Sequence, residues 1–134
     1  MAELKPEIMR LRTDEDIVRA RQRVREWSRQ QGFSLVNQTK IVTAASELAR
    51  NTVQYGGGGT LHLEVLNQRS RRGLQLTFAD QGPGIPDIEV ALKEGYSTGG
   101  GLGLGLPGTR RLTDEFELVS CPGVGTRVRI VKWT

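Results

Sequence analysis

The sequence has one cysteine, one histidine and no long apolar run. With a single cysteine, Cys121, the chain cannot form an internal disulfide, and a reducing compartment is expected. Cys121 and His62 are too few to make a zinc site of the usual kind. We expect Cys121 to be a small buried hydrophobic residue and His62 to lie exposed on a strand.

No apolar stretch approaches the roughly 20 residues that a membrane-spanning helix needs. The first residues, MAELKPEIMRLR, have no apolar segment of the signal-peptide kind. The length of 134 residues and the apolar fraction of 37% are typical of one globular domain. We therefore expect a single domain over residues 1–134, located in the cytoplasm and not in a membrane.

Lysine is scarce, with four residues, so arginine dominates the net charge of +4. At about 100° per residue, the arginines of the first predicted helix spread around its axis and form no single stripe. No aromatic residues are interleaved with them, which disfavours nucleic-acid binding. Two readings stay open: a solvated helix face, or a docking surface for an acidic protein partner that includes Trp27. The arginines are Arg19, Arg21, Arg23, Arg25 and Arg29.

Hydrophobic periodicity predicts helices first and then mostly consecutive strands. Thr13 is a good N-cap for the first helix, which ends at Gly32. This order predicts an α+β fold in the form of a two-layer sandwich. The strands are expected at 7–12, 60–66, 73–79, 115–121 and 126–132, and the later helices at 37–55, 86–93 and 106–113.

Thirteen of the seventeen glycines gather in four clusters, at 56–59, at 82 and 84, at 99–105, and at 123 and 125. Such clusters form mobile turns, or they let the backbone approach a phosphate group closely. A P-loop is excluded because no lysine follows a glycine. A Rossmann site is disfavoured because no buried strand precedes the GxGxxG of residues 103–108, and the motifs of eukaryotic protein kinases are absent.

Three separated boxes resemble the GHKL superfamily of ATP-binding proteins. They are ELARN at 47–51 on a predicted helix, DQGPG at 80–84 after a strand, and GGGLGLG at 99–105 before a helix. The resemblance implies a Bergerat-type sandwich whose mostly antiparallel, mixed sheet is covered by helices on one face. It also implies ATP and Mg²⁺ as ligands.

The boxes assign roles to individual residues. The resemblance implies Glu47 as the catalytic base and Asn51 as a ligand of Mg²⁺ and the nucleotide; a carboxylate one turn from an amide suits both tasks. Asp80 would accept a hydrogen bond from the adenine amino group. The remaining nucleotide-binding residues would be Gly82, Gly84, Ser97, Thr98, Gly99, Gly100, Gly101, Leu102, Gly103, Leu104, Gly105 and Thr126.

Longer runs narrow the resemblance to the small anti-sigma-factor-type serine/threonine kinases, and among them to the stressosome switch kinases. The runs are AASELARN, DQGPGIPDI, YSTGGGLGLGLPG and RLTDEF. A kinase of this type phosphorylates a STAS-domain protein and activates a PP2C-type phosphatase by binding its regulatory domain. An anti-sigma kinase that binds a sigma factor is the alternative.

The sequence departs from the superfamily pattern at two places. Tyr55 stands where many relatives have histidine, and no lysine or arginine lies between Gly95 and Pro107. The phosphate charge must then be met by Mg²⁺, by backbone N–H groups, or by Arg50 or Arg110. The sequence leaves this choice open, and it leaves open whether the chain is a monomer or a homodimer.

Overall fold

The computed structural model describes residues 5–85 and 105–134. The predicted helix at 86–93 lies outside these residues. The first half of the chain contains β1 (Glu7–Leu11), α1 (Asp14–Gln30), α2 (Leu35–Gln54), β2 (Gly59–Gln68) and β3 (Arg71–Asp80). The second half contains α4 (Gly105–Arg111), β4 (Glu115–Cys121) and β5 (Gly125–Trp133). None of the described helices is long and apolar enough to cross a membrane.

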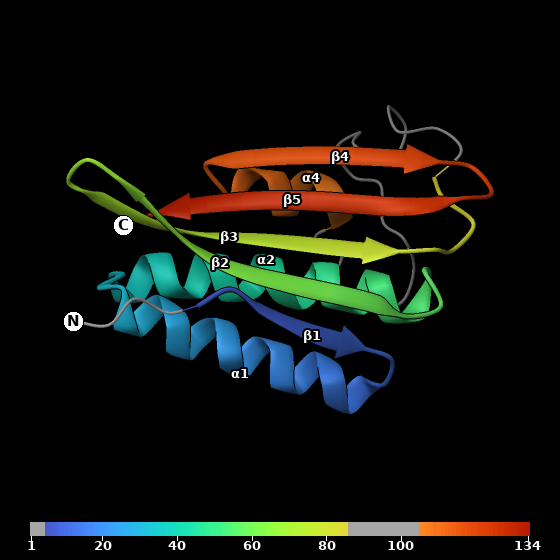
Figure 1. Cartoon of the computed structure of the whole chain (residues 1–134), viewed down its shortest axis with the longest axis horizontal. Coiled ribbons are helices and arrows are strands. Elements are labelled where there is room, and N and C mark those ends of the chain that lie inside the picture. The colour runs from blue at the N-terminus through green and yellow to red at the C-terminus, as the bar shows by residue number, and fades with distance from the viewer. Residues whose placement is uncertain (1–4, 86–104) are drawn as a thin grey trace.

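The five strands form one sheet in the order β1-β2-β3-β5-β4 (Figure 1). All four pairings are antiparallel, so the described strands lack the parallel component of the expected mixed sheet. In Figure 1, α2 and α4 lie behind the sheet and α1 runs along the edge strand β1. The predicted α+β two-layer architecture is confirmed.

The core lies between the helices and one face of the sheet because side chains alternate along each strand. On β2, Leu61 and Leu63 are fully buried while His62 between them is exposed, as expected. On β3, Leu74, Leu76 and Phe78 point to the same side. The apolar side chains of α1 and α2 cover this face and exclude water from it, which is the main force that holds the two layers together.

Three expectations from the sequence are wrong in detail. Trp27 is only 4% exposed, because α1 turns it toward the core with Val24, so it cannot belong to a docking surface. Cys121 is exposed, because it ends an edge strand on the face opposite Leu118. Helix α2 begins two residues earlier than predicted, because the Ser34 side chain caps it by accepting from the Asn37 N–H at 3.1 Å.

The start of α1 is fixed by a reciprocal capping box between Thr13 and Asp16. The Asp16 carboxylate accepts from the backbone N–H groups of Arg12, at 2.8 Å, and Thr13, at 3.1 Å, and it pairs with the Arg19 side chain. The Arg12 N–H and then Arg19 lower the pKa of Asp16 from 3.8 to about 2. Because folding lowers this pKa, the ionised group favours the folded state above pH 3.8, and this contribution is lost as the pH falls through about 2.

Asp16→Asn should therefore lower the melting temperature at pH 7, and its difference from the wild type should shrink as the pH falls from 3.8 to about 2. Asp14→Asn is the matched control, because Asp14 lies exposed in the same first turn. Thermal melting followed by circular dichroism would measure both. A difference for Asp16→Asn that stayed constant down to pH 2 would contradict this account of the cap.

Candidate functional site

The second half of α2 places an acidic and an amide side chain one turn apart. Glu47 and Asn51 are four residues apart, so they share one face of the helix. Glu47 is only 6% exposed, and its carboxylate pairs with the Arg50 guanidinium at 3.5 Å. Asn51 is half-buried. A nearly buried carboxylate in a helix is costly unless it is paired, and here the partner comes from the same helix.

The loop after α2 carries the chain from this pair to the end of β3. The backbone N–H groups of Tyr55 and Gly56 donate to the Asn51 carbonyl at 2.9 and 3.0 Å. The Gly58 N–H donates to the Thr52 carbonyl at 2.9 Å. These bonds satisfy carbonyls that a helix end would leave without partners. They also fix Gly56 against the side chain of Asp80.

Asp80 ends β3 and uses one carboxylate oxygen as an anchor. Its Oδ1 accepts from the Gly82 N–H at 2.9 Å and from the Thr126 N–H at 3.3 Å. Among the described residues, its Oδ2 has no hydrogen-bond partner. One oxygen thus fixes the carboxylate in place, and the other remains able to accept from a ligand such as an amino group.

Glycines surround Asp80 because there is no room for side chains. A Cβ at Gly56 would lie 2.4 Å from Asp80 Cγ, and one at Gly125 would lie 2.1 Å from the Asp80 carbonyl oxygen. A Cβ at Gly82 would meet the Gly56 Cα at 2.7 Å, and one at Gly59 would meet the Ala79 carbonyl oxygen at 2.0 Å. The glycines at 56, 59, 82 and 125 therefore form a close-packed cradle around Asp80, in which Gly56 lies directly against the carboxylate.

The turn between β4 and β5 holds the loop that follows Asp80. The Ser120 hydroxyl accepts from the Ile85 N–H at 2.7 Å and contacts the Thr126 hydroxyl at 2.8 Å. The Gly123 N–H donates to the Pro83 carbonyl at 2.8 Å. Gly84 has a φ of +78°, and a Cβ there would lie 2.5 Å from the Cys121 carbonyl oxygen. Thr126 is thus held beside Asp80 by the Asp80 carboxylate on β3 and the Ser120 hydroxyl on β4.

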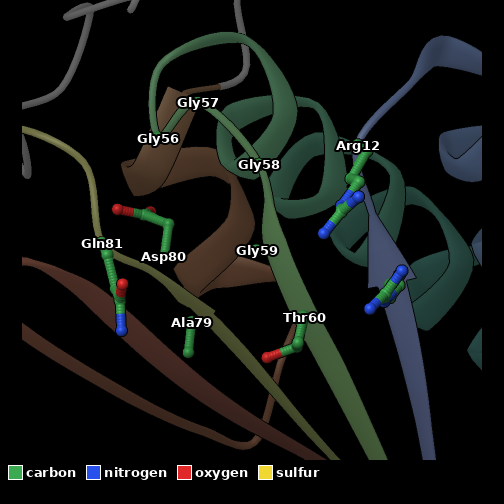
Figure 2. A pocket seen from close by; sticks show the side chains of 10 residues that line it. Arg12, Gly56, Gly57, Gly58, Gly59, Thr60, Ala79, Asp80 and Gln81 are labelled. Atoms are coloured by element: carbon green, nitrogen blue, oxygen red, sulfur yellow. The ribbon is translucent and has the colours of Figure 1, made fainter.

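A separate hollow of about 640 Å³ lies on the other side of this strand end (Figure 2). Figure 2 shows the Asp80 side chain directed toward Gly56, whereas the Ala79 and Gln81 side chains point the opposite way. Arg10, Arg12 and Thr60 line the hollow, so it opens on the sheet face away from the helices. The hollow therefore shares both the glycine loop and Asp80 with the cradle, and the Asp80 side chain is directed toward Gly56 at its edge.

The structure brings together the predicted residues Glu47 and Asn51 on α2, and Asp80, Gly82 and Thr126 around the end of β3. Gly84 continues the Asp80 loop, and Gly105 is buried at the start of α4. The other predicted nucleotide-binding residues, Ser97, Thr98, Gly99, Gly100, Gly101, Leu102, Gly103 and Leu104, lie outside the described residues.

Sequence reasoning missed three contributors to this site. Gly56 and Gly125 were noted only as members of glycine clusters, and their contact with Asp80 follows from strand pairing that the sequence does not display. Arg50 was considered only for a phosphate contact, and its pairing with Glu47 was not foreseen. The three-residue spacing of Glu47 and Arg50 on a helix was the signal that could have indicated it.

Comparison with known proteins decides the family. Residues 11–132 match the family model described as the histidine kinase-like ATPase domain. The chain belongs to this family. The resemblance to the GHKL superfamily seen in the three boxes is thereby confirmed.

Two curated relatives of this histidine kinase-like ATPase domain bear on its subgroup. The chain is 49% identical over 125 residues to the serine/threonine-protein kinase RsbT of Bacillus subtilis, covering 93% of this chain and 94% of that protein. It is 33% identical over 99 residues to the anti-sigma F factor of Halalkalibacterium halodurans, covering 70% of this chain and 68% of that protein. The narrower resemblance to anti-sigma-factor-type serine/threonine kinases is confirmed as well.

Solved structures support the fold of the domain. The RsbU and RsbW domains of a Mycobacterium tuberculosis protein superpose with a TM-score of 0.69 at 18% identity, over 96% of this chain and 32% of that chain. The mycobacterial sensor histidine kinase MprB superposes with a TM-score of 0.55 at 16% identity, over 98% of this chain and 97% of that chain. At these identities the likeness shows the fold alone.

The donor set of the site fits a nucleotide with a magnesium ion. No three His, Cys, Asp or Glu side chains cluster into a metal site within residues 5–85 and 105–134. Mg²⁺ commonly takes one or two protein ligands and fills its other positions with phosphate oxygens and water. The single amide oxygen of Asn51 is compatible with this kind of magnesium coordination.

Gly56→Ala should weaken ATP binding on the order of tenfold or more, because the new methyl group would displace the Asp80 carboxylate and a lost buried hydrogen bond costs about 1–3 kcal/mol. Gly57→Ala is the matched control in the same loop. It has a φ of +74°, so alanine strains the backbone, but its Cβ would meet nothing within 4 Å. Calorimetric titration with ATP would measure both. Equal losses in the two variants would show that loop disruption, and not contact with Asp80, governs binding.

Proposed function

We propose that this chain is an ATP-dependent protein serine/threonine kinase of bacterial stress signalling. The observation that carries the proposal is the nearly buried Glu47 one turn from Asn51, on a helix whose following loop packs against the cradled Asp80. The 49% identity to a protein named a serine/threonine-protein kinase supports it. The proposed base and metal ligand then lie on one helix, and the loop after that helix contacts the proposed adenine acceptor.

The cradle would select adenine. The free Oδ2 of Asp80 accepts from the adenine amino group, whereas guanine presents a carbonyl at the equivalent position and would be repelled. Thr126 assists at the base, and Gly82 and Gly84 let it lie against the backbone. We assign the polyphosphate to Ser97, Thr98 and the glycine-rich residues through Gly105.

Glu47 would supply the general base. Its carboxylate accepts the proton of the substrate serine or threonine hydroxyl as the hydroxyl oxygen attacks the γ-phosphorus and ADP leaves. Asn51 would hold Mg²⁺, which neutralises charge on the phosphates when bound. Beyond these two roles, the site has to position the substrate hydroxyl and the phosphates. A rigid helix that carries both Glu47 and Asn51 is suited to this.

The protein substrate is proposed to be a STAS-domain protein, and the second partner the regulatory domain of a PP2C-type phosphatase in the cytoplasm. The alternative is a sigma-factor-binding kinase of the same fold, since the anti-sigma F factors are also relatives. The higher identity and coverage of the RsbT match favour the switch kinase. A pull-down with a sigma factor separates the two readings, because a switch kinase does not retain it.

Glu47→Gln should lower the rate of phosphate transfer to a STAS-domain protein by about 10²–10⁴-fold, the usual contribution of a general base. ATP should still bind, because the base acts mainly in the transition state. Asn51→Ala should instead weaken Mg²⁺-dependent ATP binding. Single-turnover transfer from γ-labelled ATP and calorimetry would measure the two effects separately.

Glu26→Gln is the control for the kinase experiment, because Glu26 also pairs with an arginine three residues away but lies exposed on α1. Near-normal turnover of Glu47→Gln would show that the base assignment is wrong. The folded Glu47→Gln protein should also still stimulate the phosphatase, since docking needs surface and not chemistry. Loss of that stimulation would favour the anti-sigma reading.

A further inference from the structure

We propose that Arg50 is a positioning residue: its guanidinium holds the Glu47 carboxylate in the orientation in which it receives the proton of the substrate hydroxyl. The inference rests on the proposed role of Glu47 as the base. It resolves a question that the sequence leaves open, namely whether Arg50 serves the phosphates or another part of the site.

The geometry ties the two side chains to each other. Arg50 Nη1 lies 3.5 Å from Glu47 Oε2, and their side chains are 26% and 7% exposed. Within the described part of the chain, Arg50 is the only polar partner of the Glu47 carboxylate. One oxygen of the base therefore has its direction set by a single neighbour on the same helix.

Burial makes this pair different from the ion pairs on the surface. Arg23 and Glu26 are also three residues apart on a helix, but their side chains are 44% and 47% exposed, so water screens both charges. Glu47 has almost no contact with water, and a buried carboxylate without a partner would be strongly destabilised. Arg50 thus supplies the partner that a nearly buried carboxylate requires.

The helix also places Arg50 beside Glu47 without covering the face that Glu47 shares with Asn51. At about 100° per residue, Arg50 projects roughly 60° to one side of Glu47, and Asn51 roughly 40° to the other. Arg50 can therefore hold Glu47 from one side while the other side stays directed toward the metal ligand and the nucleotide. Arg110, the other cation considered for the phosphates, lies exposed on α4 and remains available for them.

The test is a double-mutant cycle on phosphate transfer. Arg50→Ala should lower kcat on the order of 10- to 100-fold, because misplacing a reacting group by about 1 Å can cost about 10²-fold. The dissociation constant for ATP should change by less than about 3-fold. Arg50→Lys, which keeps the charge, should recover part of kcat. In the Glu47→Gln background, removing Arg50 should change kcat by less than about 3-fold, since a residue that acts through another has no effect once that residue is gone.

Two results would overturn the inference. The first is an equal loss of kcat from Arg50→Ala in the wild-type and Glu47→Gln backgrounds, and the second is an ATP affinity that falls as far as kcat. Either would place Arg50 directly on the phosphates. Normal turnover of Glu47→Gln would instead show that Glu47 is not the base. Failure of the proposed function can therefore be distinguished from failure of the positioning role of Arg50.

Controls keep the cycle interpretable. Arg69→Ala removes an exposed arginine of the turn between β2 and β3 and should leave kcat unchanged. Thermal melting shows whether each variant is folded. The double variant with Glu47→Gln and Arg50→Ala removes both charges together, so it leaves neither charge without its partner. If Arg50→Ala alone does not fold, Arg50→Lys carries the test: a normal kcat with weakened ATP binding then contradicts the positioning role.

Discussion

The Asp80 carboxylate connects segments that lie far apart in the sequence. One of its oxygens binds the loop after β3 through the Gly82 N–H and the adjacent strand β5 through the Thr126 N–H. Gly56, at the end of the α2 segment, packs against the same side chain. A Cβ at Gly56 would lie 2.4 Å from Asp80 Cγ, and one at Gly82 would lie 2.7 Å from the Gly56 Cα, so glycines are required at these two positions although they cost conformational entropy. This contact ties the end of α2, which carries Glu47 and Asn51, to the end of β3, while apolar packing holds the rest of the helix on the sheet.

In the proposed site, the residue that recognises adenine and the residue that acts in phosphate transfer lie on different elements. Asp80 lies at a strand end, where backbone bonds fix it within the sheet, whereas Glu47 lies inside a helix, where only a neighbouring side chain can fix it. The proposed adenine acceptor is therefore immobilised by the fold itself, and the proposed base by its pairing with Arg50. This difference explains why a catalytic base within a helix needs a dedicated partner. It also makes phosphate transfer easier to disturb by single substitutions than the binding of adenine.

Much of the fold could be predicted because its elements follow local rules. Alternation of apolar and polar residues identified β2 and β3, and the capping residue Thr13 identified the start of α1. The strand order and the contact of Gly56 with Asp80 could not be predicted, since they depend on pairing between distant segments. Trp27 and Cys121 were misjudged because residue type alone does not tell which face of an element is covered. The three boxes identified the nucleotide-binding family, while the Glu47–Arg50 pair emerged only from side-chain positions.

The most direct test of this account is a nuclear magnetic resonance titration of the ¹⁵N-labelled chain with ATP and with GTP in the presence of Mg²⁺. The amide signals of Gly56, Gly82 and Thr126 report on the cradle around Asp80. The account predicts that ATP shifts these three signals strongly, while GTP at the same concentration leaves them nearly unchanged. Equal shifts with both nucleotides, or shifts confined to Arg10, Arg12 and Thr60 around the separate hollow, would contradict it.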